Sequence, residues 1–202
     1  MLSRLGIKAT FFIITHLKKF EGKTLLTSKP ELIKEISKSG HEIGSHSKTH
    51  ANLVMMPLHK VEEEARESKQ LLENLVGDEI RGFAYPYGAY NTHVIKIISK
   101  HYKYARGAGI NPLEDPFNVN VKNKYTLGAF TKRRKHIRKI LRLPIKLVGR
   151  HYDEYLGIVI VMHRESLLEI LTLVKYLRFL SSNVYFVTMS ELIELLVRNC
   201  SI

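Results

Sequence analysis

Two histidines four positions apart carry the clearest chemical signal in the chain. The segment GHEIGSHSKTH, residues 40–50, contains His46 and His50. Imidazoles with this spacing on a helical turn point to one side and can both bind one cation, at about 2.0–2.1 Å for zinc. Imidazole also suits cobalt, nickel and manganese. The spacing therefore predicts a divalent metal site with a third protein ligand, and Thr49 is expected to orient a ring. The alternative is a polar turn with both rings in solvent.

Two further segments contain residues suited to catalysis. His163 ends the apolar run GIVIVMH and is either a core histidine or a general acid. The turn YPYG contains Tyr85, Pro86 and Tyr87. Proline and glycine explain this turn structurally. Alternatively, it directs the backbone N–H of Tyr87 at a developing oxyanion and lets both tyrosines stack on a sugar.

Strand-like and helix-like segments alternate along the whole chain. This order predicts a mostly parallel sheet with helices outside it, and such sheets gather reactive groups at the carboxyl ends of their strands. No repeat or linker divides the sequence, so residues 1–202 are predicted to form one domain. Apolar runs predict strands at 7–14, 41–45, 81–86, 103–108, 124–130, 157–163 and 184–188. Helices are predicted at 30–39, 57–76, 92–101, 134–143, 166–182 and 190–199.

Short polar signals predict where several helices begin and end. Ser28 with Glu31, and Thr188 with Glu191, have the spacing of capping boxes. Helix ends are expected at Gly40 and Gly77, and Asn91 or Thr92 is expected to cap the helix at 92–101.

The charge of the chain is concentrated in one region. The formal net charge is +13, and residues 131–150 contain nine lysines and arginines with no acidic residue. This basic insertion is interpreted either as a helix with its charges in water or as a contact with an anionic membrane surface through residues 132–150. Nucleic acid ranks last, because no recognition motif accompanies the charge.

The predicted location of the protein depends on the cysteine count and on the search for targeting and membrane-spanning segments. The single cysteine, Cys200, permits no disulfide within the chain. No signal peptide is found, and no apolar run approaches the roughly 18 residues that span a bilayer. We expect a cytoplasmic or membrane-peripheral protein, and the sequence does not predict its oligomeric state.

The motifs occur together in a recognisable order. LGIKATFFI is followed by ELIKEISKSGHEIGSHSKTHANL, FAYPYGAYN, IVIVMH and FVTMSELIELL. This order resembles the polysaccharide deacetylase family, the NodB-homology or carbohydrate esterase 4 family. The resemblance implies an α/β fold, a distorted (β/α) barrel of the glycoside hydrolase and deacetylase type. It also implies metal-dependent removal of acetyl groups from N-acetylated sugars or polysaccharides.

The resemblance also implies roles for individual residues. His46 and His50 match the H-[ST]-x-x-H metal ligands, for which zinc is expected. His163 matches the histidine that protonates the leaving group, and Tyr87 supplies an oxyanion donor through its backbone N–H. Tyr85, Pro86 and Arg106 are predicted to contact the acetylated carbohydrate.

One family motif is missing from the sequence. The T-F-D-D-G strand supplies the catalytic base and the third metal ligand, and this chain has no adjacent pair of aspartates. Asp78, Asp115 and Asp153 lie in other contexts. Arg81 is the nearest arginine before the YPYG turn and is a candidate for orienting the base.

Two interpretations follow from the missing motif. The first is that the barrel lacks its first strand because the true start lies upstream, and it is preferred because an incomplete barrel exposes strand edges. The second is a non-catalytic relative that binds a sugar or a polyanion.

Overall fold

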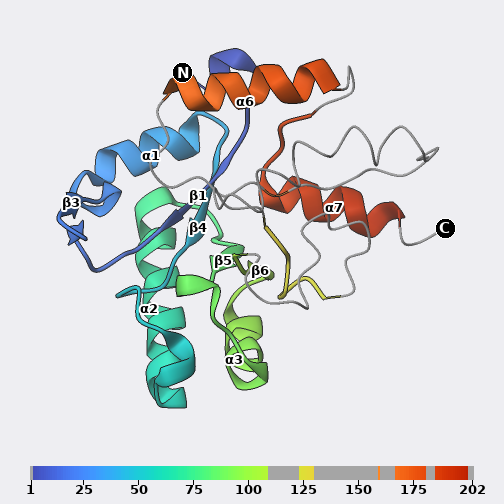
Figure 1. Cartoon of the computed structure of the whole chain (residues 1–202). Helices are drawn as coiled ribbons and strands as arrows, with labels where there is room; N and C mark the ends of the chain where they lie inside the picture. Colours follow the sequence, from blue (N-terminus) through green and yellow to red (C-terminus); the bar gives the residue numbers. More distant parts are fainter. Residues whose placement is uncertain (1, 109–122, 130–158, 160–166, 181–184, 200–202) are drawn as a thin grey trace.

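The centre of the molecule is a four-stranded parallel sheet (Figure 1). The computed structural model describes residues 2–108, 123–129, 159, 167–180 and 185–199. The strand order is β1-β4-β5-β6, and a separate hairpin pairs two short strands, β2 and β3. The strands are β1 Thr10–Ile13, β2 Lys19–Phe20, β3 Lys23–Thr24, β4 Glu42–Ser45, β5 Gly82–Ala84 and β6 Tyr104–Arg106.

Within the described residues, helices follow β1, β4 and β5, as the alternating pattern predicted. In Figure 1, α2 and α3 lie side by side below the sheet, α1 lies at the upper left, α6 at the top and α7 at the right. The helices are α1 Pro30–Lys38, α2 Leu58–Val76, α3 Thr92–His101, α6 Leu167–Leu180 and α7 Met189–Asn199. The short 3-10 turns are η1 Ser3–Leu5, η2 Leu26–Ser28, η3 Leu53–Met55 and η4 Pro86–Gly88.

The two faces of the sheet are covered by different cores. Successive strand residues point to opposite faces, so Phe11 packs in one cluster and Phe12 in the other. The larger cluster joins the strands to helices α1, α2 and α3. The smaller cluster joins Tyr104 to Leu127, Val159 and the start of α7.

At the amino end of β4, one carboxylate ties the sheet to α7. Glu42 accepts hydrogen bonds from Thr10 Oγ1 at 2.8 Å, Tyr104 Oη at 2.8 Å and the Ser190 backbone N–H at 3.0 Å. We call these four residues the amino-end clamp. Tyr104 reaches Glu42 across β5, and this path requires Gly82, since a Cβ there would lie 2.3 Å from the tyrosine ring. Burial, and then the neighbouring Glu42, raise the pKa of Tyr104 well above its usual value.

The predictions for helix ends had mixed outcomes. The capping box of Thr188 and Glu191 is confirmed, because each accepts a hydrogen bond from the backbone N–H of the other. The Asn91 side chain caps α3 by accepting from Val94 N–H at 2.9 Å. The predicted capping box at Ser28 is wrong. The Ser28 hydroxyl donates to the Lys18 carbonyl, and α1 has no side-chain cap.

Both predicted glycine positions follow helix ends. Gly40 and Gly77 have φ values of 83° and 76°, in the left-handed region that favours glycine.

Two predicted strands are absent from the described residues. Tyr185–Thr188 form no strand, although Lys8 N–H donates to the Phe186 carbonyl at 3.4 Å. In the predicted strand 124–130, of which residues 124–129 are described, Leu127 alone among the described residues makes a bridge, to Arg106. The predicted strand at 157–163 is described only at Val159, and the helix at 134–143 and the basic insertion lie outside the described residues. Within the described helices, none has both the length and the apolar character needed to cross a bilayer.

Candidate functional site

The two predicted metal ligands lie together in the loop that follows β4. The ring centroids of His46 and His50 are 4.7 Å apart, and the ring planes are inclined at 77°. The segment is not the helical turn that the spacing predicted. Ser47 and His50 have φ values of 65° and 58°, so two left-handed residues turn the chain instead. The sequence thus predicted that the two rings lie close together, but not the backbone that brings them together.

His46 is oriented by a backbone carbonyl on the next strand. Its Nδ1 lies 2.8 Å from Ala84 O, and its backbone N–H donates to Ile13 O at 2.8 Å. A carbonyl oxygen only accepts, so Nδ1 carries the proton in the neutral ring and Nε2 carries the lone pair. Outer hydrogen bonds of this kind fix the ring of a metal-binding histidine.

His50 lies among three other rings. Its ring centroid is 4.5 Å from that of Phe20, on β2, and 4.8 Å from that of Tyr87. Its backbone N–H donates to Ser47 Oγ at 2.9 Å. The histidine is therefore held from both its backbone and its ring.

The turn after β5 places Tyr87 beside these histidines. Tyr87 has a φ of 58° and is 56% exposed, the largest exposure in this turn. The amides of Gly88 and Ala89 each donate to the carbonyl three residues earlier, that of Tyr85 and Pro86 respectively, whereas the Tyr87 N–H has no acceptor among the described residues. Gly88 is required here, because a Cβ would lie 2.7 Å from the Cβ of Ala108. An amide without an acceptor is what an oxyanion donor needs.

Tyr85 and Pro86 are placed differently from the prediction of substrate contact. Both are buried, and the Tyr85 hydroxyl donates to Tyr125 O at 3.1 Å. The Tyr85 ring belongs to the core that covers α2 and α3. It cannot stack on a sugar without leaving that core, so only Tyr87 offers an exposed ring in the turn.

The two candidate arginines are also displaced from an exposed rim. Arg106 ends β6 beside Ala84, but its side chain is buried with its guanidinium 4.9 Å from the Phe12 ring centroid. Arg81 precedes β5 and forms an ion pair with Glu79, at the end of the strand opposite to the histidines. Arg81 therefore lies away from the histidine loop.

A carboxylate that the sequence analysis missed supports the histidine loop. Glu64 is 4% exposed, and its side chain accepts from Lys48 N–H at 2.8 Å, Thr49 N–H at 2.9 Å and Thr49 Oγ1 at 2.6 Å. Thr49 therefore bonds to Glu64 and not to a ring, contrary to expectation. The available signal was a charged residue on the buried stripe of α2, next to Ala65.

Buried hydroxyl groups extend this support below the loop. Ser45 Oγ donates to Ser68 Oγ at 2.9 Å, and the Ser47 N–H donates to Ser45 Oγ at 3.2 Å. Tyr102 Oη lies 3.0 Å from Ser68 Oγ and donates to the Ala65 carbonyl. Burial raises the pKa of Tyr102, so this phenol stays neutral and acts as a hydrogen-bond donor.

The chemistry of the donor set fits a divalent cation with two protein ligands. Neutral imidazoles with fixed rings are good ligands for zinc and other first-row metals. No group of three His, Cys, Asp or Glu suited to a metal occurs in the described part of the chain. His163, the predicted general acid, lies outside the described residues.

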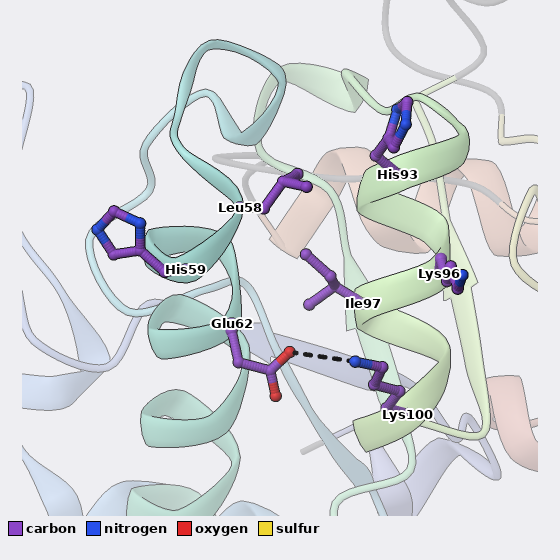
Figure 2. Close-up of a pocket in the computed structure, with 7 residues that line it drawn as sticks. All are labelled: Leu58, His59, Glu62, His93, Lys96, Ile97 and Lys100. Carbon is purple, nitrogen blue, oxygen red and sulfur yellow. Dashed lines mark ion pairs between the residues drawn. The ribbon is translucent and has the colours of Figure 1, made fainter.

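An open pocket between α2 and α3 is separate from this site (Figure 2). Glu62 forms an ion pair with Lys100 across it at 4.0 Å, and Leu58 is exposed at one end. None of the predicted site residues lines it. The lining consists of Leu58, His59, Glu62, His93, Lys96, Ile97 and Lys100.

Comparison with known proteins identifies the family. A family model described as Polysaccharide deacetylase matches residues 1–105. The chain belongs to this family. A chitooligosaccharide deacetylase of Azorhizobium caulinodans is 30% identical to this deacetylase-family chain over 93 residues, which are 46% of the chain and 40% of that enzyme. The curated relatives are longer than the part that this chain matches. The match covers 29% of the length of a Bacillus subtilis relative and 40% of the length of the Azorhizobium deacetylase.

Solved structures support the same fold class. The Xyl-CE4 domain of a multidomain xylanase from the Trinervitermes trinervoides hindgut metagenome matches with a TM-score of 0.60 and 21% identity, over 96% of this chain and 80% of that domain. A CE4-family pseudoenzyme from Bacillus anthracis matches with a TM-score of 0.61 and 18% identity, over 95% of this chain and 57% of that protein. At these identities the likeness concerns the fold. The predicted α/β class, with the distorted barrel of the deacetylases, is confirmed.

Proposed function

We propose that this chain forms part of a metal-dependent deacetylase site for acetylated carbohydrates, in which His46 and His50 bind one divalent cation. The observation that carries the proposal is the hydrogen bond from His46 Nδ1 to Ala84 O, with the His50 ring 4.7 Å away. In this tautomer the lone pair of His46 is on Nε2, the atom that would bind a cation beside a second imidazole. Zinc is the expected metal, with cobalt, nickel and manganese as alternatives.

The proposed chemistry is hydrolysis of an acetyl group on a sugar. A bound divalent cation would polarise the acetyl carbonyl and lower the pKa of a water molecule. The Tyr87 N–H would donate to the oxyanion, and the exposed Tyr87 ring would pack on a sugar face. His163 is proposed as the acid that protonates the leaving amine or alcohol.

The test measures metal binding and acetate release separately. Metal-free protein is titrated with Zn²⁺ or Co²⁺ by calorimetry, and acetate release is followed from N-acetylglucosamine oligomers. We expect His46→Ala and His50→Ala each to weaken metal binding by about tenfold or more, because each removes one of two ligands. His59→Ala is the matched control, since His59 is exposed on α2 away from the site. Unchanged binding in both site variants would overturn the proposal.

A second candidate is a non-catalytic protein that binds a sugar or a polyanion. It is favoured by the lack of an adjacent aspartate pair in the sequence, and by the lack of a third ligand in the described part of the chain. On this hypothesis the protein binds N-acetylglucosamine oligomers but releases no acetate with any of the four metals. Loss of oligomer binding in Tyr87→Ala, with metal binding intact, would support it.

A further inference from the structure

Glu64 is a buried carboxylate with an unusual set of partners. It lies on the core-facing stripe of α2, beside Val61 and Ala65, where the side chain is 4% exposed. A buried carboxylate is costly unless it accepts hydrogen bonds. Within the described part of the chain, no lysine, arginine or histidine lies within ion-pair distance of it. Its charge is therefore balanced by neutral donors.

All three of those donors come from two adjacent residues of the histidine loop. One carboxylate oxygen accepts from the backbone N–H groups of Lys48 and Thr49, and the other accepts from Thr49 Oγ1. The Lys48 side chain does not compete, because its ammonium bonds to Glu63 and Glu67. Glu64 thus binds the backbone immediately before His50.

The loop needs such a partner because its backbone is strained. Ser47 and His50 both have positive φ, which costs a non-glycine residue on the order of 1 kcal/mol or more. On the other side of the loop, His16 N–H donates to the Lys48 carbonyl at 2.9 Å. The Lys48 backbone is therefore bonded at its N–H by α2 and at its carbonyl by the segment after β1. This double attachment holds His50 next to His46.

We propose that Glu64 is a positioning residue that holds the His50 ring in place for metal binding. The effect on metal affinity rests on the function proposed above, whereas the effect on the His50 ring does not. Glu64→Gln keeps the shape of the side chain, but it removes the charge and replaces one of the two accepting oxygens with an amide NH₂. The loop can then relax its positive-φ residues and move the His50 ring.

The test compares two carboxylates that both accept several hydrogen bonds. Glu64→Gln acts on the histidine loop, and Glu42→Gln acts on the amino-end clamp. Zn²⁺ affinity is measured by calorimetry on each full-length variant, and its melting temperature is measured without metal. We expect Glu64→Gln to weaken Zn²⁺ binding by about tenfold or more, the usual range for partners behind a ligand. Glu42→Gln should lower the melting temperature and leave the affinity within about twofold.

A second variant and a second readout separate the possible failures. Thr49→Val removes one of the three hydrogen bonds at little cost to the core, and should weaken Zn²⁺ binding by a smaller factor, about threefold. The His50 ring resonance, shifted by Phe20 and Tyr87, is followed by NMR without metal. If wild-type protein binds no Zn²⁺ but Glu64→Gln moves this resonance, the metal proposal fails and the positioning role stands. If both Glu64→Gln and Thr49→Val keep wild-type affinity and resonance, the positioning role is wrong.

Discussion

A carboxylate holds each end of β4, and the two differ in what they bind. At the amino end, Glu42 binds the side chains of Thr10 and Tyr104 and the first turn of α7, which are distant in sequence. At the carboxyl end, the partners of the Glu64 carboxylate among the described residues are Lys48 and Thr49. The first set joins separate elements and should determine global stability. The second set determines the conformation of one loop and should determine function.

The largest effect is expected at Gly82, where the amino-end clamp depends on the absence of a side chain. Gly82→Ala would place a methyl group 2.3 Å from the Tyr104 ring, so the ring must move away from Glu42. We expect a loss of about 2–3 kcal/mol in the free energy of unfolding, measured in urea. Zn²⁺ affinity should stay at the wild-type value. A similar loss of affinity would break the distinction between the two ends.

A smaller effect is expected from removing one donor while keeping the ring. Tyr104→Phe deletes the hydroxyl that donates to Glu42, and hydrogen bonds to charged groups contribute about 1.5–3 kcal/mol. The control is Tyr125→Phe, whose lost hydroxyl donates to the neutral carbonyl of Tyr102. Urea unfolding should rank the Tyr104 variant as the less stable. The reverse order would mean that Glu42 contributes little at the amino end.

The helix attached to the amino-end clamp should lose stability in acid. Burial acts to raise the pKa of Glu191, but hydrogen bonds from Lys8 and Thr188 outweigh it and lower the pKa below its usual value. A lowered folded-state pKa stabilises the fold above the unfolded value, about 4.3, and this stabilisation disappears as the pH falls through the folded value. At pH 6.5, Glu191→Gln should therefore lose about 1 kcal/mol, the usual contribution of a cap. The difference between wild type and variant should shrink toward pH 3 in thermal unfolding, and a constant difference would contradict this assignment.

The smallest effect is expected at a residue that binds neither end of β4. Ser28 has the sequence pattern of a cap, but its exposed hydroxyl donates to the Lys18 carbonyl at 2.8 Å. Ser28→Ala should change the free energy of unfolding by less than about 0.5 kcal/mol. Thr188→Ala, at the capping box that does form, should cost about 1 kcal/mol. Equal losses would show that Ser28 acts as a cap in solution.

Local signals predicted the fold better than they predicted the site. Asn91 and the pair of Thr188 and Glu191 cap helices as expected, because both donor and acceptor lie within one turn of the chain. Ser28 failed because a carbonyl ten residues away competes for its hydroxyl. Sequence spacing does not reveal such a competitor.

Within the site, the sequence predicted which histidines meet but not what holds them. His46 and His50 follow a strand end, as parallel sheets require, and lie together. Glu64 was missed because its partners are two amides about fifteen residues earlier, which only the folded loop brings to α2. Tyr85 was predicted to contact the sugar because the sequence does not show which side of the turn each tyrosine takes. The structure buries Tyr85 and exposes Tyr87.

The double attachment of the Lys48 peptide group also affects how the loop opens. Amide hydrogens in loops usually exchange with solvent quickly, but those of Lys48 and Thr49 are bonded to a buried carboxylate. They can exchange only when α2 separates from the loop, so their protection should match that of amides within α2 itself. In deuterium-labelling experiments, this irregular segment should therefore behave as part of the same cooperative unit as the helix behind it.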